Sequence, residues 1–169
     1  KKISLISLTF FLLTFLYNIL NAQEIIGVPR IIDGDTVHIN NYKIRLEGID
    51  APEIKQKCKK SFLKISSVIG INFNKNYDCG VISKKKLIQK IKNSKIRCSS
   101  SSKDRYKRYL ATCFKGNINL NRWMVNQGYA VAYKKYSKRY VLDEQDAKEN
   151  MRGIWQGSFL NPEKWRKLN

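Results

Sequence analysis

The chain has 169 residues, enough for one domain with its own core and too few for two. Its apolar fraction of 43% is ordinary for a globular protein, which excludes intrinsic disorder as the default state. With 33 Lys and Arg against 13 Asp and Glu, the net charge is +20, which indicates a polyanionic partner, either nucleic acid or an anionic membrane surface. A compositional bias toward lysine, isoleucine and asparagine is the alternative explanation.

Residues 1–22 have the order of a secretory signal peptide. Two lysines precede an apolar run over residues 3–20, and the small residue Ala22 stands where a signal peptidase could cleave. An uncleaved membrane anchor is the alternative, because the run is near the minimum length that spans a bilayer. We therefore expect a secreted or periplasmic protein, or a membrane-anchored one whose domain lies outside the cytoplasm.

A strand and a hairpin are predicted next. Residues 25–32 are β-branched and apolar, which is typical of a strand. Residues 36–39 and 42–49 form two further runs around Asn40 and Asn41, which tolerate positive φ and suit a two-residue turn. The sequence therefore predicts a tight hairpin here.

The register of this hairpin places an acid beside an arginine. A two-residue turn at positions 40 and 41 puts Thr36 opposite Arg45. Asp35 and Arg45 then lie within one step of each other across the ladder. A bulge would shift that pairing, so the sequence predicts their proximity and not a specific contact.

The later part of the chain alternates between helical and strand patterns. Apolar residues recur at three- and four-residue steps in the helical segments, and one of these ends at a glycine. Helices are predicted over 81–92, 118–128 and 141–151, and strands over 95–98, 109–114 and 129–133, with a polar loop at 99–102. This order fits an α+β fold, a five-stranded OB-fold-like β-barrel with about three packed helices.

The remaining segments define the domain organisation. The folded domain is expected over residues 23–157, with a lysine-rich insertion around residues 54–78 that reads as a surface excursion. Residues 158–169 form a C-terminal tail to which the sequence assigns no function.

The four cysteines indicate two disulfides. They lack metal-site spacing, and an even number of cysteines in an oxidising compartment favours disulfide bonds. Three pairings are possible. Cys98 and Cys113 flank the predicted polar loop and would lie across a hairpin, which favours Cys98–Cys113 and, by elimination, Cys58–Cys79. Four buried free thiols are the alternative.

Four acidic residues are concentrated in the first hairpin and its exit. They are Asp33, Asp35, Asp50 and Glu53, in a chain otherwise poor in acids. Carboxylates placed together repel one another unless a cation binds, and oxygen ligands without His or Cys select calcium or magnesium. The alternative is turn chemistry, since Asp and Gly are common in turns.

Several motifs in register resemble the staphylococcal nuclease (thermonuclease) family. The match runs from about Val28 to Trp155 and keeps the family's order. Its segments are Ile32-Asp33-Gly34-Asp35-Thr36-Val37, Ile44-Arg45-Leu46, Ile49-Asp50-Ala51-Pro52-Glu53, Asp104 to Ala111, Asn119-Leu120 to Ala130, and Ala147-Lys148 to Trp155.

This resemblance implies a metal site and a catalytic set. Asp35 and Asp50 match calcium-binding carboxylates, the carbonyl oxygen of Ala51 matches a main-chain ligand, and Asp33 matches an acid behind these ligands. Glu53 matches the general base. The two phosphate-binding arginines of the family correspond to Arg45 and Arg108.

The resemblance also implies contacts to nucleotides. Tyr106, Tyr133 and Tyr136 fall near the family's nucleotide-contacting tyrosines, and Arg105 is expected to contact nucleic acid beside Tyr106. Aromatic rings at such positions stack on exposed bases and favour single strands or frayed duplex.

The sequence therefore predicts a monomeric, calcium-dependent endonuclease that hydrolyses DNA and RNA, with single strands preferred and magnesium as a less suitable substitute. It indicates no protein partner. A non-catalytic nucleic-acid-binding module on the same scaffold and a membrane-anchored DNA-uptake protein are the alternatives.

Overall fold

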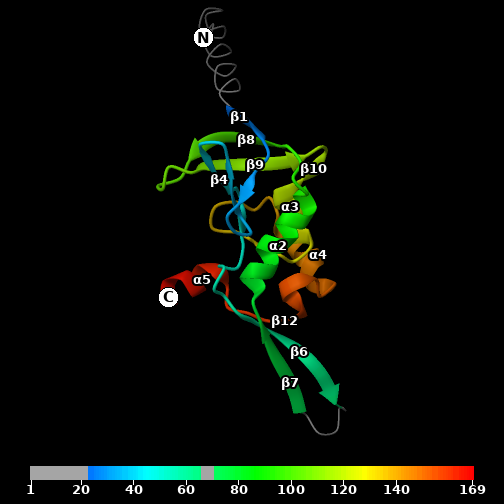
Figure 1. The fold of residues 1–169 in the computed structure, drawn as a ribbon. Helices are drawn as coiled ribbons and strands as arrows, with labels where there is room; N and C mark the ends of the chain where they lie inside the picture. Colours follow the sequence, from blue (N-terminus) through cyan, green and yellow to red (C-terminus); the bar gives the residue numbers. More distant parts are fainter. Residues whose placement is uncertain (1–22, 66–70) are drawn as a thin grey trace, which may run out of the picture.

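The curved sheet at the centre of the molecule confirms the predicted fold class. The computed structural model describes residues 23–65 and 71–169, so the predicted signal peptide lies outside the described residues (Figure 1). The sheet has the strand order β1-β8-β9-β4-β3-β2, with β10 paired to β9, and it curls into a half-barrel. β4 and β9 run parallel, whereas the other neighbours are antiparallel. The strands are β1 (Gln23–Gly27), β2 (Arg30–Ile31), β3 (Thr36–Ile39), β4 (Tyr42–Leu46), β8 (Ile96–Lys103), β9 (Tyr109–Lys115) and β10 (Ile118–Asn119).

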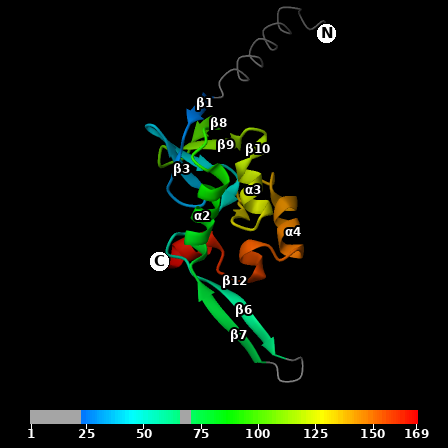
Figure 2. The ribbon, with the colours of Figure 1, turned by 45° about the vertical axis from the view of Figure 1, so that its right-hand side comes forward.

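Helices pack against the sheet and against one another, and the last of them end the chain (Figures 1 and 2). The three predicted helices are present with slightly different ends, and the tail adds a fourth in the described part of the chain. They are α2 (Cys79–Ile91), α3 (Leu120–Asn126), α4 (Val141–Glu149) and α5 (Pro162–Leu168), with a 3₁₀ helix η1 (Gly153–Gln156). No described helix has the length and apolar character needed to cross a membrane.

The first hairpin has the predicted register. Thr36 pairs with Arg45, and Asn40 adopts a φ of 50° in the turn. On β4, Ile44 and Leu46 are buried in the core, so Arg45 leaves on the other face of the strand. The hairpin therefore places an arginine outside the barrel core and beside the acids that flank β3.

The predicted loop at 99–102 is wrong, because these serines continue β8. Ser100 is buried, and its hydroxyl donates to the carbonyl oxygens of Ser102 and Leu110 at 3.0 and 2.8 Å. Both neighbouring strands pair with this segment, β1 on one side and β9 on the other. The real turn follows at residues 104–107, so tertiary pairing overrides the low strand propensity of the serines.

The insertion is a β-hairpin that extends from the domain. β6 (Cys58–Ile65) and β7 (Ile71–Tyr77) pair antiparallel and point away from the half-barrel, at the end opposite to β1 (Figures 1 and 2). The tail contributes β12 (Gly157–Ser158), which pairs with β6. Insertion and tail are therefore joined in one small sheet.

Both favoured disulfides are present. Cys98 and Cys113 face each other across β8 and β9, and both are fully buried. Cys58 is bonded to Cys79 and joins the start of the insertion hairpin to the start of α2. The second disulfide belongs to a small apolar cluster with Val131 and Ile154, separate from the main core.

We predict that loss of the Cys98–Cys113 disulfide lowers the free energy of unfolding by about 3 kcal/mol, as the loop-entropy relation gives for a loop of this size. The bond closes a separation of 15 residues. The measurement is urea denaturation of the Cys98→Ala/Cys113→Ala variant against the oxidised wild type. A loss below about 1 kcal/mol would contradict the prediction, because it would mean that the bond constrains the unfolded chain little.

Candidate active site

Two buried carboxylates meet at one guanidinium. Arg45 forms an ion pair with Asp35 through Nη1, and its Nη2 donates to Asp50 Oδ1 at 2.8 Å. Asp35 and Asp50 are only 2% and 1% exposed. The sequence predicted the proximity of Asp35 and Arg45, and the structure adds Asp50 to the same cluster.

Three short elements carry these side chains. Asp35 directly precedes β3, Arg45 lies in β4, and Asp50 ends β5 (Ile49–Asp50). Between β4 and β5 the chain turns at Gly48, whose φ of +76° is a conformation that glycine adopts without strain. β5 pairs with β11 (Val131–Ala132), and this pairing holds β5 in place.

Hydrogen bonds fix the orientation of Asp35. Its Oδ2 accepts from the amide of Ala51 at 2.8 Å, and its Oδ1 accepts from the Thr36 hydroxyl at 3.1 Å. The amide of Asp35 in turn donates to Asp33 Oδ1 at 2.9 Å. The expected role of the Ala51 carbonyl oxygen as a metal ligand stays a prediction.

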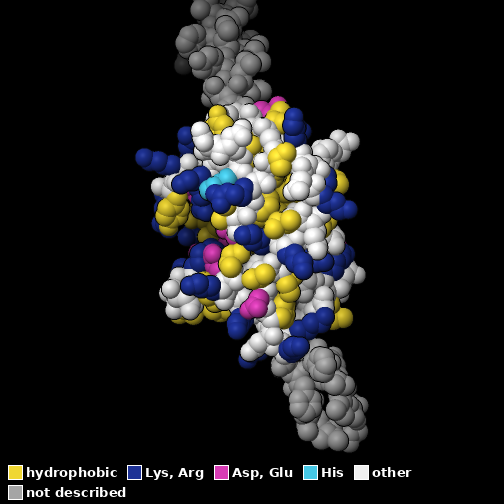
Figure 3. Space-filling model, in the orientation of Figure 1, with side chains coloured by type: hydrophobic (Ala, Val, Ile, Leu, Met, Phe, Trp, Pro, Cys, Tyr) yellow, Lys and Arg dark blue, Asp and Glu magenta, His cyan; other side chains and the backbone are white. Residues whose placement is uncertain are grey.

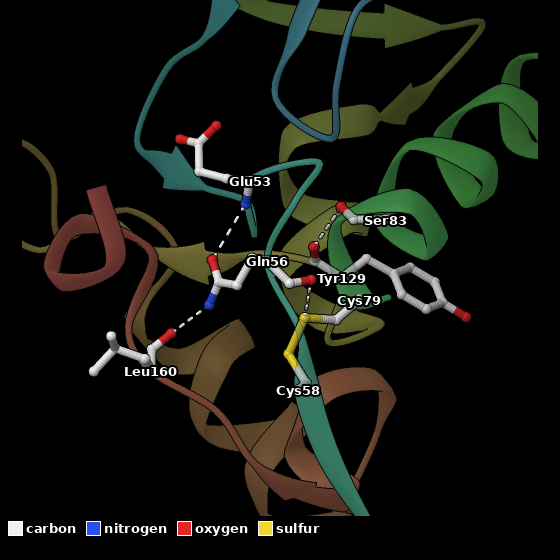
Figure 4. The surroundings of a disulfide bond; sticks show 7 residues. All are labelled: Glu53, Gln56, Cys58, Cys79, Ser83, Tyr129 and Leu160. Carbon is white, nitrogen blue, oxygen red and sulfur yellow. Dashed lines mark hydrogen bonds between the residues drawn. A yellow bond between two sulfur atoms is a disulfide. The ribbon is translucent and has the colours of Figure 1, made fainter. Parts of the chain in front are cut away.

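Glu53 is held beside this cluster through its backbone. Its amide donates to Gln56 Oε1 at 3.2 Å, and Gln56 Nε2 donates to the Leu160 carbonyl oxygen at 2.6 Å (Figure 4). Gly80, in the first turn of α2, packs so closely on the Glu53 carbonyl that a Cβ there would collide with it. The Glu53 backbone is therefore fixed by α2 and by the tail.

The Cys58–Cys79 disulfide lies directly behind this loop (Figure 4). Cys79 Sγ approaches the Gln56 carbonyl oxygen to 3.3 Å. Because the sulfur is bonded in the disulfide and carries no proton, this is a packing contact. The insertion hairpin is thus anchored immediately behind the loop that carries Glu53.

A second arginine, which the sequence did not indicate, reaches the cluster from the tail. Arg166 in α5 donates from Nη1 and Nη2 to the two carboxylate oxygens of Asp50, both at 2.9 Å, and from Nη1 to Glu53 Oε1 at 2.9 Å. The start signal of α5 was readable, since Asn161 caps the helix and Pro162 opens it. The contact of α5 with Asp50 and Glu53, more than a hundred residues earlier in the chain, could not be read from the local sequence.

Burial and charge shift the acidity of the cluster. Burial, together with the charge of Asp35, raises the pKa of Asp33 to about 7. Burial also raises the pKa of Asp50, while the hydrogen bonds from Arg166 act to lower it. For Arg45, burial opposes the charged form, but the carboxylates of Asp35 and Asp50 more than offset it, so its pKa is raised.

Arg108 belongs to a neighbouring group of side chains on the β8–β9 turn. Its Nε donates to Asp104 Oδ2 at 2.8 Å, and these bonds lower the pKa of Asp104 although partial burial opposes the shift. The Tyr106 ring is 62% exposed and lies 4.8 and 5.4 Å from the guanidinium carbons of Arg105 and Arg108. This turn therefore presents two cations and an aromatic ring to solvent.

Arg108 lies close to the pairing partner of Arg45 along the chain. Arg45 pairs with Leu110 across the parallel β4–β9 ladder. Arg108 lies two residues before Leu110, in the turn segment just before β9 begins at Tyr109. No hydrogen bond or ion pair among the described residues joins Arg108 to Asp35, Asp50 or Glu53.

Two predicted nucleotide contacts form an aromatic pair near Asp50. The rings of Tyr133 and Tyr136 stand edge to face with centroids 4.7 Å apart. Tyr133, Asp50 and Lys135 contribute to the wall of a cavity of about 220 Å³. Burial first, and then the charge of Asp50, raises the pKa of Tyr133. The cavity therefore combines a carboxylate with an aromatic face.

A hard divalent cation fits the donors at this cluster. Arg45 shows that one positive group can bridge Asp35 and Asp50. Among residues 23–65 and 71–169, no three His, Cys, Asp or Glu side chains are grouped closely enough to hold a metal ion. Two carboxylates would therefore hold the cation with main-chain oxygen and water, as calcium and magnesium permit.

Comparison with known proteins gives consistent matches. The family model described as staphylococcal nuclease homologue matches residues 43–157. The succinoglycan biosynthesis protein ExoI of Rhizobium meliloti is 34% identical over 137 residues, which cover 79% of this chain and 66% of that protein. A Haemophilus influenzae protein named uncharacterized endonuclease is 32% identical over 148 residues, which cover 83% of this chain and 71% of that protein.

A plant relative is longer. The probable staphylococcal-like nuclease CAN3 of Oryza sativa subsp. japonica is 28% identical over 138 residues, which cover 79% of this chain and 30% of that protein. The chain thus spans about two thirds of the two bacterial relatives and under a third of the plant one.

We predict that Arg45→Met lowers the free energy of unfolding by about 3–5 kcal/mol, because it leaves two buried carboxylates without their shared counter-charge. Arg97→Met is the matched control, since Arg97 pairs with Glu24 on the surface, where such bonds contribute about 0–1 kcal/mol. Urea denaturation at neutral pH measures both. Equal losses in the two variants would contradict a structural role for Arg45.

Proposed function

This chain belongs to the family of staphylococcal nuclease homologues, and from that we propose that it is a calcium-dependent endonuclease that hydrolyses phosphodiester bonds of DNA and RNA. Family membership and relatives named as endonucleases support a nuclease. The observation that carries the finer proposal is the convergence of Asp35 and Asp50 on Arg45, with Glu53 joined to Asp50 through Arg166. Hydrolysis of a phosphodiester needs a general base and positive charge beside the phosphate.

Each side chain has a defined task in this reaction. Glu53 accepts the proton of the attacking water, for which its position at the rim of the cluster is suitable. Arg45 in β4 and Arg108 just before β9 bind the non-bridging phosphate oxygens and stabilise the charge that develops on them. A guanidinium suits this task better than an ammonium group, because its planar fork donates two parallel hydrogen bonds.

Asp35 and Asp50 would hold the cation, with the Ala51 carbonyl oxygen as a further ligand and Asp33 behind them. The bound cation supplies Lewis acidity at the phosphate. Two carboxylates and few other protein ligands imply weak binding, on the order of 10⁻⁴–10⁻³ M, a range found in extracellular calcium sites. This weak affinity favours calcium outside the cell over magnesium inside it.

The surface and the aromatic side chains support a polynucleotide substrate. Lysine and arginine side chains are spread over the face shown in Figure 3, with few acids among them. Such a surface attracts phosphates without regard to base sequence and is sensitive to salt. Tyr106, Tyr133 and Tyr136 would stack on unpaired bases, and Arg105 would contact the backbone, so we propose that single strands are preferred.

We predict that Glu53→Gln lowers the turnover of single-stranded DNA by about 10²–10⁴-fold, because the variant cannot accept the proton from water. Its affinity for the same DNA should stay unchanged. Calcium-dependent cleavage by residues 23–169, with and without chelator, is the measurement. Glu149→Gln, on the exposed end of α4, is the matched control. Wild-type turnover by the Glu53 variant would refute its role as base.

A separate proposal concerns location. We propose export with cleavage after Ala22, on the basis of the sequence pattern of residues 1–22. We predict that N-terminal sequencing of the exported protein begins at Gln23. Recovery of an exported protein that retains residues 1–22 in the membrane fraction would favour the anchored alternative.

A further inference from the structure

Arg45 and Arg166 both bind Asp50, and both donate to its Oδ1. The Arg45 side chain is 12% exposed and also holds the buried Asp35. The Arg166 side chain is 32% exposed and binds the same carboxylate. One guanidinium is therefore built into the domain, and the other is brought to its rim by α5 of the tail.

Arg166 uses the atoms that the proposed chemistry requires. Both carboxylate oxygens of Asp50 accept hydrogen bonds from it, and the same guanidinium nitrogen that binds Asp50 Oδ1 also binds Glu53 Oε1. A cation held by Asp50 needs lone pairs on these same carboxylate oxygens. A base at Glu53 acts through its carboxylate. In this arrangement Arg166 binds both oxygens of Asp50 and one oxygen of Glu53, Oε1.

The negative charge of the neighbouring carboxylates explains why a guanidinium lies beside Asp50 and Glu53. Asp35, Asp50 and Glu53 are neighbours, and Arg45 alone cannot neutralise three carboxylates. Carboxylate hydrogen bonds with Asp50 and Glu53 raise the pKa of Arg166 although burial opposes its charge, so the tail arginine stays cationic. A divalent cation at the same place would make the second positive charge redundant, and it would repel Arg166.

We propose that Arg166 is an exchangeable internal counter-cation, which holds Asp50 and Glu53 in the metal-free enzyme and yields them when a divalent cation binds. This inference rests on the proposed function of the site. Cation binding and the docking of α5 on the site are then mutually exclusive, so each weakens the other by the same factor. The tail arginine is a positioning residue that sets the cation affinity of the enzyme.

The remaining contacts of the tail fit such an exchange. Apart from Arg166, the described polar contacts between residues 159–169 and the body of the domain are the Gln56 bond to Leu160 and a 3.8 Å pair of Glu163 with the exposed Lys135. The first lies before α5, and the second is weak because it is long and exposed to solvent. Release of Arg166 therefore removes the main polar attachment of α5 and leaves the Gln56 anchor in place.

The test is calcium affinity, measured by titration calorimetry on residues 23–169 without nucleic acid. Arg166→Gln should bind calcium about tenfold more tightly than the wild type, because a competing unit charge at contact distance is removed. Arg166→Lys should lie between them, since an ammonium group cannot bind both Asp50 oxygens in parallel. Lys164→Gln is the control, because it changes the charge of α5 equally from an exposed position.

A second measurement follows the helix itself. Trp165 directly precedes Arg166, so calcium should shift its fluorescence in the wild type, and subtraction of a Trp165→Phe spectrum isolates that signal from Trp123 and Trp155. Equal calcium affinities of the wild type and Arg166→Gln, with both folded by circular dichroism, would overturn the exchange. A folded wild type that neither binds calcium nor cuts DNA with it would instead refute the proposed function.

Discussion

The burial of Asp35 and Asp50 against one guanidinium is the interaction on which the rest of the site depends. Taking two ionised carboxylates out of water costs several kcal/mol per ion, and only opposite charge and well-placed hydrogen bonds offset that cost. Arg45 supplies the charge, while the Ala51 amide and the Thr36 hydroxyl saturate Asp35. Because these groups come from β3, β4 and the chain after β5, the hairpin register and the turn at Gly48 must both be correct before the cluster can exist. The cluster of Asp35, Arg45 and Asp50 is thus also a constraint on the fold.

The site reverses the electrostatic character of the protein around it. A chain with a net charge of +20 attracts phosphate, whereas the cluster of carboxylates would repel it. The arginines reduce this conflict locally, since the guanidinium groups of Arg45 and Arg166, both bound to Asp50, offset most of the negative charge. Long-range attraction and local charge balance therefore come from different residues. Lysines supply the attraction, and the arginines at Asp50 supply the local balance.

Local patterns revealed most of the fold, and long-range contacts account for what they missed. Strand alternation and the Asn40-Asn41 turn determined the pairing of Thr36 with Arg45, and cysteine placement determined both disulfides. The serines of β8 were misread because their strand conformation comes from neighbours on both sides, which composition does not encode. Arg166 was missed for a similar reason: a lysine- and arginine-rich tail has no local feature that marks one cation as the partner of Asp50. The family resemblance ended at Trp155 and could not reach it.

The pairing of β12 with β6 has a consequence for the integrity of the protein. The short tail strand covers part of the outer edge of β6, whose other edge is paired with β7. Proteolytic trimming at the C-terminus would uncover backbone donors and acceptors on that edge, and an uncovered edge strand recruits strands from other molecules. The same cut would remove α5. A clipped molecule would therefore lack the Arg166 contact with Asp50 and gain a tendency to self-associate, so the survival of the last dozen residues bears on solubility as well as on the candidate site.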